Sequence, residues 1–220
     1  MTTPLLLASA SPRRRQILAK LGLPYTVAVS PGDEDAAQAQ YKGPNDGLAQ
    51  WTAAYKALMM FSLPETADQL VVTADTTVLL DDQVLGKPRD AAHAFELLSS
   101  LRGRWHRVVT GVVVSRLVDG QLQMQGASCS TPVLMRPYSD DEINAYIASG
   151  DPLDKAGAYG IQHAEFQPTE SIDGCYYNVV GLPLCTLTHL LASFDVQPVS
   201  TGCEDTACPW SARCHISAQS

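Results

Sequence analysis

The sequence lacks several features that would assign it to a common class of protein. It contains no apolar run close to the ~20 residues that a membrane-spanning helix requires, so we expect no membrane partner. It contains no GxxxxGK[ST] motif, so we expect no P-loop. Basic residues are also few: 15 lysines and arginines face 23 aspartates and glutamates, giving a formal net charge of -8. This balance argues against broad, charge-driven binding to nucleic acid.

Cysteines are few and unevenly placed. Only six occur, and Cys203, Cys208 and Cys214 lie close to the C-terminal end, followed by His215. These four side chains could ligate zinc, but they lack the tight CxxC pair that is typical of a structural zinc site, and we favour a flexible tail with incidental cysteines. The N-terminal segment MTTPLLLASASPRRR has its apolar stretch before its basic one, the reverse of a secretory signal. We therefore expect a cytoplasmic protein without a disulfide framework.

Apolar runs and helix signals interleave along the chain. Buried strands are expected at residues 5–8, 70–74 and 108–118, the last returning through Asp119-Gly120 as a strand that ends near residue 129. A further strand is expected at residues 25–29, and a hairpin at residues 77–80 and 83–85. Amphipathic helices are expected at residues 12–21, 48–61, 91–102, 140–149 and 183–194, and residues 30–47 and 151–174 are expected to be irregular. This pattern predicts an α/β domain over residues 1–195, with a mixed sheet flanked by helices, and a flexible tail over residues 196–220.

The segment LASASPRRR, residues 7–15, combines a strand end, a serine-rich turn and a helix start. Free N–H groups at a helix N-terminus attract anions. Ser9 and Ser11 add hydroxyl donors, and the guanidinium of Arg13 fits phosphate oxygens. The alternative is a capped helix with a solvated basic face, and the pattern alone does not decide between the two.

Three further segments carry candidate site residues. Asp75 in VVTADTTV ends an expected buried strand, where it could be a metal ligand or general base, or could simply begin a turn. Lys87 in LGKPRD lies between a glycine and a proline, although most loop lysines only solvate a surface. The segment DKAGAYGIQ, residues 154–162, has glycines and alanines that indicate close approach of its backbone to a ligand or to another strand.

Together with VSPGDE, AAYKA, HRVVTGV and NVVGLPL, these segments follow an order that closely resembles the Maf family of nucleotide pyrophosphatases, over residues 5–191. The resemblance implies a Maf/Ham1-like (inosine triphosphatase-like) fold with a central cleft between two lobes. It implies that a nucleoside triphosphate is split into a monophosphate and pyrophosphate with the help of Mg²⁺ or Mn²⁺. The segment DKAGAYGIQ is similar to the branch that acts on dTTP and UTP. The family is often dimeric, so a homodimer is among the expected assemblies.

The resemblance also implies roles for individual residues. The phosphate-binding turn and its facing lysines would be Ser9, Arg13, Arg14, Lys56 and Lys87. The carboxylates for catalysis or metal binding would be Glu34 and Asp75, with Asp75 as the proton acceptor. The positions linked to nucleobase selection would be Arg13, Thr76 and Gln162.

Two departures and two alternatives accompany the resemblance. Gln162 is followed by HAEFQPTESIDGCYYN, where the family more often has an early glycine, and residues from about 196 onward have no family counterpart. One alternative is the Maf branch that acts on 7-methyl-GTP, which has a different segment in place of DKAGAYGIQ. The other is a non-catalytic nucleotide-binding regulator of cell division, which could dispense with Glu34 and Asp75. Because both carboxylates are present, the sequence favours an enzyme.

Overall fold

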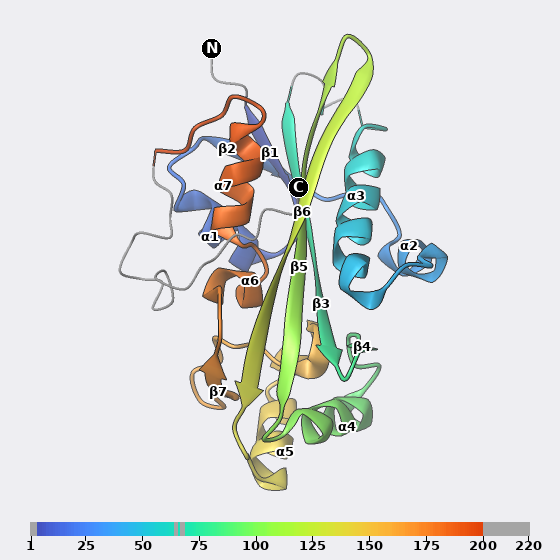
Figure 1. The fold of residues 1–220 in the computed structure, drawn as a ribbon. Coiled ribbons are helices and arrows are strands. Elements are labelled where there is room, and N and C mark those ends of the chain that lie inside the picture. Colours follow the sequence, from blue (N-terminus) through green and yellow to red (C-terminus); the bar gives the residue numbers. More distant parts are fainter. Residues whose placement is uncertain (1–3, 64–65, 67–68, 200–220) are drawn as a thin grey trace.

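The computed structural model describes residues 4–63, 66 and 69–199. Among these residues, seven strands form one mixed sheet in the order β2-β1-β3-β5-β6-β7, with β4 beside β3 (Figure 1). The strands are β1 (Leu5–Ala8), β2 (Tyr25–Ala28), β3 (Leu70–Leu80), β4 (Gln83–Leu85), β5 (Trp105–Val118), β6 (Gln121–Met135) and β7 (Thr169–Ile172). β1 pairs in parallel with β2 and β3, whereas the other pairings are antiparallel. The expected mixed sheet is confirmed.

Helices cover both faces of this sheet (Figure 1). On one face α3 (Leu48–Met60) packs on β3 and β5, with α2 (Glu34–Gln40) beside it. On the other face lie α1 (Pro12–Ala19), α6 (Tyr176–Val180) and α7 (Leu184–Ala192). The helices α4 (Ala91–Leu101) and α5 (Asp140–Ala148) lie near the N-terminal end of β5. In the part of the chain that is described, no helix has the length and apolar character needed to cross a membrane.

The even-numbered residues of β3 and β5 face two separate hydrophobic cores. Val72, Ala74 and Val112 pack against α1, α6 and α7 in the first core. Val78 and Val108 pack against α4 and α5 in the second. Because the cores lie at opposite ends of the same strands, the polar residues between them are placed where the two groups of helices meet.

One edge of β3 carries a gap, and this gap positions the site. β1 pairs only with residues 70–72 of β3, and β4 pairs with residues 78–80 on the same edge, because β5 takes the other edge along residues 71–79. Residues 73–77 therefore have no strand beside them on this edge among the described residues. Asp75 lies within the gap. The sequence prediction that Asp75 ends a strand is wrong, because pairing with β5, where Asp75 is opposite Gly111, carries β3 onward to Leu80.

The helix starts and the hairpin that local capping and turn residues predict are confirmed. The side chains of Ser11 and Asp90 accept hydrogen bonds at the starts of α1 and α4, and Ser139 with Glu142 forms a capping box at α5. The expected hairpin at Asp119-Gly120 is present, with φ of 51° and 75°.

Three expectations about loops and lengths are wrong. Residues 30–47 contain α2 and a short 3-10 helix at Asn45–Gly47, because Asp33 caps a first turn rich in acidic residues. β6 continues past residue 129 to Met135, since it pairs with the whole of β5. Residues 151–174 contain two 3-10 turns and β7, and α6 was not expected. The predicted tail lies largely outside the described residues, although the N–H of Val199 donates to Leu21 O (3.1 Å).

Candidate active site

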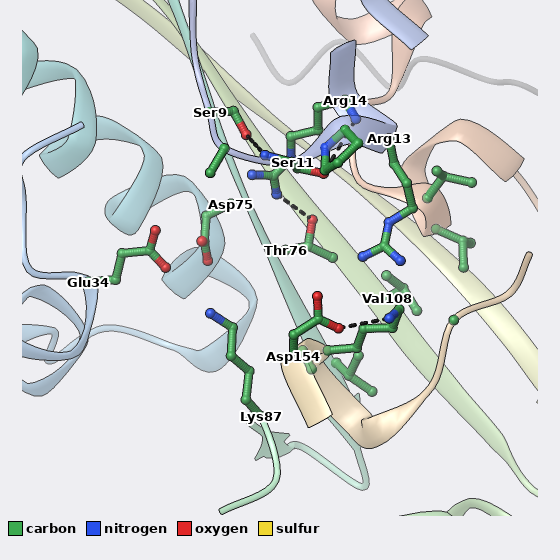
Figure 2. Close-up of a pocket in the computed structure, with 18 of the residues that line it drawn as sticks. Ser9, Ser11, Arg13, Arg14, Glu34, Asp75, Thr76, Lys87, Val108 and Asp154 are labelled. Carbon is green, nitrogen blue, oxygen red and sulfur yellow. Dashed lines mark hydrogen bonds and ion pairs between the residues drawn. The ribbon is translucent and has the colours of Figure 1, made fainter. Parts of the chain in front are cut away.

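A pocket of about 550 Å³ opens at the gap in the edge of β3, between the two hydrophobic cores (Figure 2). It is lined by the turn after β1, by α2 and α3, by β3, by the loop after β4, and by residues 154–162. All nine site residues expected from the sequence line this one pocket: Ser9, Arg13, Arg14, Glu34, Lys56, Asp75, Thr76, Lys87 and Gln162.

The turn after β1 delivers the start of α1 to the pocket. The Ser9 hydroxyl accepts a hydrogen bond from the N–H of Ser11 (3.2 Å), and the Ser11 hydroxyl accepts one from the N–H of Arg14 (3.4 Å). These bonds fix a tight turn, and Pro12 then begins the helix. Arg13 and Arg14 both extend into the pocket (Figure 2). The segment thus brings a helix N-terminus and two guanidinium groups to the same space, an arrangement suited to an anion.

Lys56 lies between two carboxylates of the pocket, those of Glu34 and Asp75. Its ammonium is 2.7 Å from Glu34 Oε1 and 2.8 Å from Asp75 Oδ1, and it also donates to the carbonyl oxygen of Ala74 (3.3 Å). Lys56 is only 5% exposed, so this ammonium is held by protein oxygens within the wall of the pocket. Asp75 is also buried, whereas the side chain of Glu34 is 42% exposed. The α3 face of β3 therefore carries a compact carboxylate–ammonium–carboxylate group.

Burial and the surrounding charges shift the pKa values of Glu34 and Arg14. Burial by itself raises the pKa of Glu34, but the charges of Lys56, Lys87 and Arg14, with a hydrogen bond from Lys56, bring it below its usual value. Burial lowers the pKa of Arg14, and the negative charges of Asp75 and Glu34 partly oppose this. Glu34 is consequently an anion at neutral pH.

Lys87 approaches the pocket from the side opposite the serine turn. It follows β4, its side chain is exposed, and Figure 2 shows it directed toward Glu34 and Asp75. Among the described residues no ion pair holds its ammonium. It therefore remains available for a ligand in the pocket, in contrast to Lys56.

The glycines of residues 154–162 serve contacts within the protein. A Cβ at Gly157 would lie 3.0 Å from Val78 of β3, and φ there is +69°. A Cβ at Gly160 would lie 2.9 Å from the side chain of Lys155. Close approach to a strand is thus observed at Gly157, while Gly160 also lines the pocket. Gln162, at its end, is exposed and lines the pocket, and no hydrogen bond to its amide is found in the described part of the chain.

Several pocket residues had not been singled out from the sequence. Asp154 and Lys155 line the wall formed by residues 154–162, where the Lys155 ammonium contacts Asp154 (2.7 Å) and Asp151 (2.9 Å). Tyr159 lines the same wall, and its hydroxyl lies 2.7 Å from Nε2 of the buried His106. Both Lys155 and Tyr159 lie within DKAGAYGIQ, the segment whose glycines and alanines predicted a close approach of the backbone.

Glu34 and Asp75 are the candidate metal ligands among the described residues of the pocket. In the described ranges, no group of three or more His, Cys, Asp or Glu side chains could hold a metal together. Glu34 and Asp75, which share Lys56, are the two acidic side chains within reach of one cation. The candidate zinc ligands Cys203, Cys208, Cys214 and His215 lie outside the described residues.

The chain matches, over residues 4–194, the family model described as Maf-like protein. It belongs to the Maf family. Among curated Maf relatives, a dTTP/UTP pyrophosphatase of Clostridium beijerinckii is 45% identical over 84% of this chain and 96% of its own length. Proteins with the same name from Thermomicrobium roseum and Dehalococcoides mccartyi (strain CBDB1) are 42% and 41% identical, over 96% and 88% of this chain and 93% and 84% of their own lengths.

Proposed function

We propose that this chain hydrolyses dTTP and UTP to the nucleoside monophosphate and pyrophosphate. The observation that carries the proposal is the joint presence, in one pocket, of an anion-binding helix start and two carboxylates. The names of the Maf relatives, dTTP/UTP pyrophosphatase at 41–45% identity over most of each chain, support the same reaction and substrate.

The charges of the pocket suit a triphosphate. Such a ligand carries about four negative charges, and Arg13, Arg14 and Lys87 extend toward the space that it would occupy. The ammonium of Lys56 is already shared by Glu34 and Asp75. It would act mainly by holding the two carboxylates together beside the phosphates and offsetting their repulsion.

In the proposed reaction a water molecule attacks the α-phosphorus. The bond between the α-phosphorus and the oxygen bridging to the β-phosphate breaks, and that oxygen leaves with pyrophosphate. Asp75 accepts the proton of the attacking water. Its carboxylate is buried at the gap in β3, next to Thr76 and the serine turn, whereas Glu34 is half-exposed at the pocket rim. This difference in burial favours Asp75 as the base and Glu34 as the residue that orients the cation and water.

A divalent cation fits the donor chemistry of this pocket. Mg²⁺ is commonly bound through one or two carboxylates together with substrate phosphates, and Glu34 and Asp75 supply such a pair. When bound, Mg²⁺ or Mn²⁺ would offset the charge that develops on the leaving pyrophosphate. Lys87 and Arg13, which line the pocket, would also offset this charge.

Base selection is proposed to involve Gln162. Uracil and thymine present an N3–H donor between two carbonyl acceptors, and a glutamine amide can pair with part of that edge. The amide of Gln162 lines the pocket without a hydrogen bond to the described residues, so its head is available to a base. Arg13 would donate to a carbonyl of the base, and Thr76 lines the same pocket. Sites that read hydrogen bonds discriminate strongly, because a mismatched base leaves buried groups unpaired.

A screen of nucleoside triphosphates, with pyrophosphate release as the readout and Mg²⁺ or Mn²⁺ present, tests the proposal. We expect UTP and dTTP to have kcat/KM values well above those of GTP and ATP. Equal values for UTP and 7-methyl-GTP would contradict the assignment to the pyrimidine branch. Nucleotide binding without hydrolysis of any substrate would favour the regulator of cell division. A homodimer and a cytoplasmic location remain predictions.

Gln162→Glu tests the base contact separately. The change keeps the shape and replaces the amide N–H donors by an acceptor, so we expect a lower kcat/KM for UTP with the fold intact. Gln125→Glu, an exposed position on β6 far from the pocket lining, is the matched control and should leave the activity unchanged. A wild-type kcat/KM in Gln162→Glu would mean that Gln162 does not contact the base.

A further inference from the structure

The guanidinium of Arg14 belongs to a closed ring of hydrogen bonds. Its Nε donates to the carbonyl oxygen of Gly181 (2.8 Å) and its Nη2 donates to the hydroxyl of Thr76 (3.1 Å), as Figure 2 shows for the latter. The hydroxyls of Thr76 and Thr110 are 3.0 Å apart, and Thr110 donates to the carbonyl oxygen of Asn178 (2.9 Å). Asn178 and Gly181 lie on α6 and at its C-terminal cap, so the main chain of this short helix completes the ring.

The direction of every bond in this ring is determined. The single proton of the Thr110 hydroxyl goes to Asn178, so the Thr76 hydroxyl must donate to Thr110. Thr76 therefore has a lone pair, and no proton, facing Arg14. A guanidinium has only donors, so this arrangement gives it an acceptor of fixed position and sign.

Asn178 anchors the ring to the sheet from a fully buried position. Its Oδ1 accepts from the N–H of Thr110 (3.1 Å), and its Nδ2 donates to the carbonyl oxygen of Val108 and to the hydroxyl of Thr131, both at 2.8 Å. The three partners of this amide, Thr110, Val108 and Thr131, lie on β5 and β6. α6 is consequently fixed relative to the strands that carry Thr110.

Gly181 makes the close approach of α6 to the ring sterically feasible. Its φ is +119°, and a Cβ there would lie 3.3 Å from the hydroxyl of Thr76 and 3.4 Å from Nε of Arg14. A side chain at this position would push into the bonds that hold the guanidinium. The motif NVVGLPL thus supplies both the anchor, Asn178, and the close contact, Gly181.

We infer that Thr110 and Asn178 are positioning residues, which act through Thr76 and α6 to fix the direction in which Arg14 presents its remaining N–H donors to the triphosphate. Neither residue lines the pocket, and both are fully buried. The inference rests on the proposed function, in which Arg14 binds phosphate. Donors that are oriented before the substrate arrives need no reorganisation during the reaction.

Replacement of Thr110 by valine removes the hydroxyl and keeps the shape. We expect kcat/KM for UTP to fall about tenfold or more, because a small misplacement of a phosphate-binding group has effects of this order. Thr110→Ser restores the hydroxyl and should return kcat/KM to near the wild-type value. Thr73→Val is the matched control: Thr73 is fully buried in β3, its hydroxyl donates to the carbonyl oxygen of Ala53 (2.8 Å), and it lies outside the ring.

A double-mutant cycle with Arg14→Ala separates positioning from general destabilisation. If Thr110 acts through Arg14, then Thr110→Val will cost little further kcat/KM once Arg14 is alanine. Fully additive losses in the double variant, or an equal kinetic loss in Thr73→Val, would overturn the inference. If Thr110→Val does not fold, Thr76→Val breaks the same ring at a half-buried position and is used in the same cycle.

The failure of the proposed function would have a different signature. In that case the unmodified chain would hydrolyse no nucleoside triphosphate, whatever the state of the ring. The same cycle is then measured by the binding of a non-hydrolysable UTP analogue, with the same coupling between Thr110 and Arg14 expected. Independent effects of the two changes on that affinity would overturn the inference.

Discussion

Lys56 is the buried cation that pairs with both Glu34 and Asp75 in the pocket. A buried ammonium is costly unless it is paired, and here two carboxylates and a carbonyl oxygen compensate for the loss of water. In return, the ammonium offsets the repulsion between the carboxylates of Glu34 and Asp75, which it holds close together. The family resemblance implied a phosphate-facing lysine, and the contacts of Lys56 indicate that its closest partners are carboxylates.

Asp75→Asn tests the assignment of the general base. The amide keeps the size of the side chain and removes its charge, so we expect turnover to fall by at least roughly 10²-fold, the effect of losing a general base or a metal ligand. Steady-state kinetics on UTP measure this, with thermal melting to verify the fold. Asp141→Asn, at an exposed position in the first turn of α5, is the matched control and should be fully active. Near-normal rates in Asp75→Asn would remove Asp75 from the mechanism.

His106 predicts a pH dependence of stability. Burial lowers its pKa to about 4 from 6.5, and its Nε2 lies 2.7 Å from the Tyr159 hydroxyl. Between these two pH values the unfolded chain binds a proton on this ring and the folded chain does not. The stability that His106 contributes is therefore complete above pH 6.5 and is lost as the pH falls toward 4, by up to about 3 kcal/mol.

Denaturant unfolding of the wild type and of His106→Gln, at several pH values from 7.5 to 4.5, measures this contribution. We expect the variant to lose less stability than the wild type on acidification. His189→Gln, on the exposed side of α7, should retain the wild-type dependence. Parallel curves for the wild type and His106→Gln would show that His106 does not titrate differently on folding.

At the scale of elements, the sequence predicted starts and turns better than lengths. Caps such as Asp90 are local, because a side-chain oxygen and an N–H three residues away decide them. Strand lengths depend on partners that are distant in the sequence. β3 continues through Asp75, where a break was expected, because it pairs with β5 over residues 71–79, and β6 extends past its expected end because it pairs with the whole of β5. α6 has only five residues and depends on the bonds of Asn178 to β5 and β6, which no local pattern could reveal.

The packing of α3 on β5 depends on the absence of a side chain at Gly111. A Cβ there would lie 2.3 Å from both Cα and N of Gln50, at the start of α3. Since backbone atoms cannot move aside as a flexible side chain can, we expect Gly111→Ala to destabilise the fold by about 3 kcal/mol, measured by denaturant unfolding. Gly86→Ala meets no atom within 4 Å and serves as control, with an expected change near zero. Equal stabilities of the two variants would contradict this account of the helix–sheet contact.

At the scale of the whole molecule, the site brings together segments as far apart as Arg14 and Gly181, which are 167 residues apart. This separation explains which features of the site could be predicted from the sequence and which could not. Every expected site residue lines the pocket, because the order of the motifs identified the family. The contacts between those residues were not accessible from the motifs. That Lys56 bridges Glu34 and Asp75, and that Arg14 is held by Thr76, follows from the gap in β3 and from the packing of α6.

The C-terminal tail is expected to be dispensable for catalysis. The match to the family ends at residue 194, and Phe194 is the last residue of the first hydrophobic core apart from partly buried Val196. We expect a chain that ends at Gln197 to retain kcat/KM for UTP and most of its thermal stability. A chain that ends at Val199 is the matched control, because it keeps the hydrogen bond from Val199 to Leu21 (3.1 Å). If only the shorter chain melts earlier, that bond is responsible. If both lose activity, the tail takes part in the enzyme, and metal analysis of the full chain with Cys203, Cys208 and Cys214 replaced by serine would test whether zinc mediates its effect.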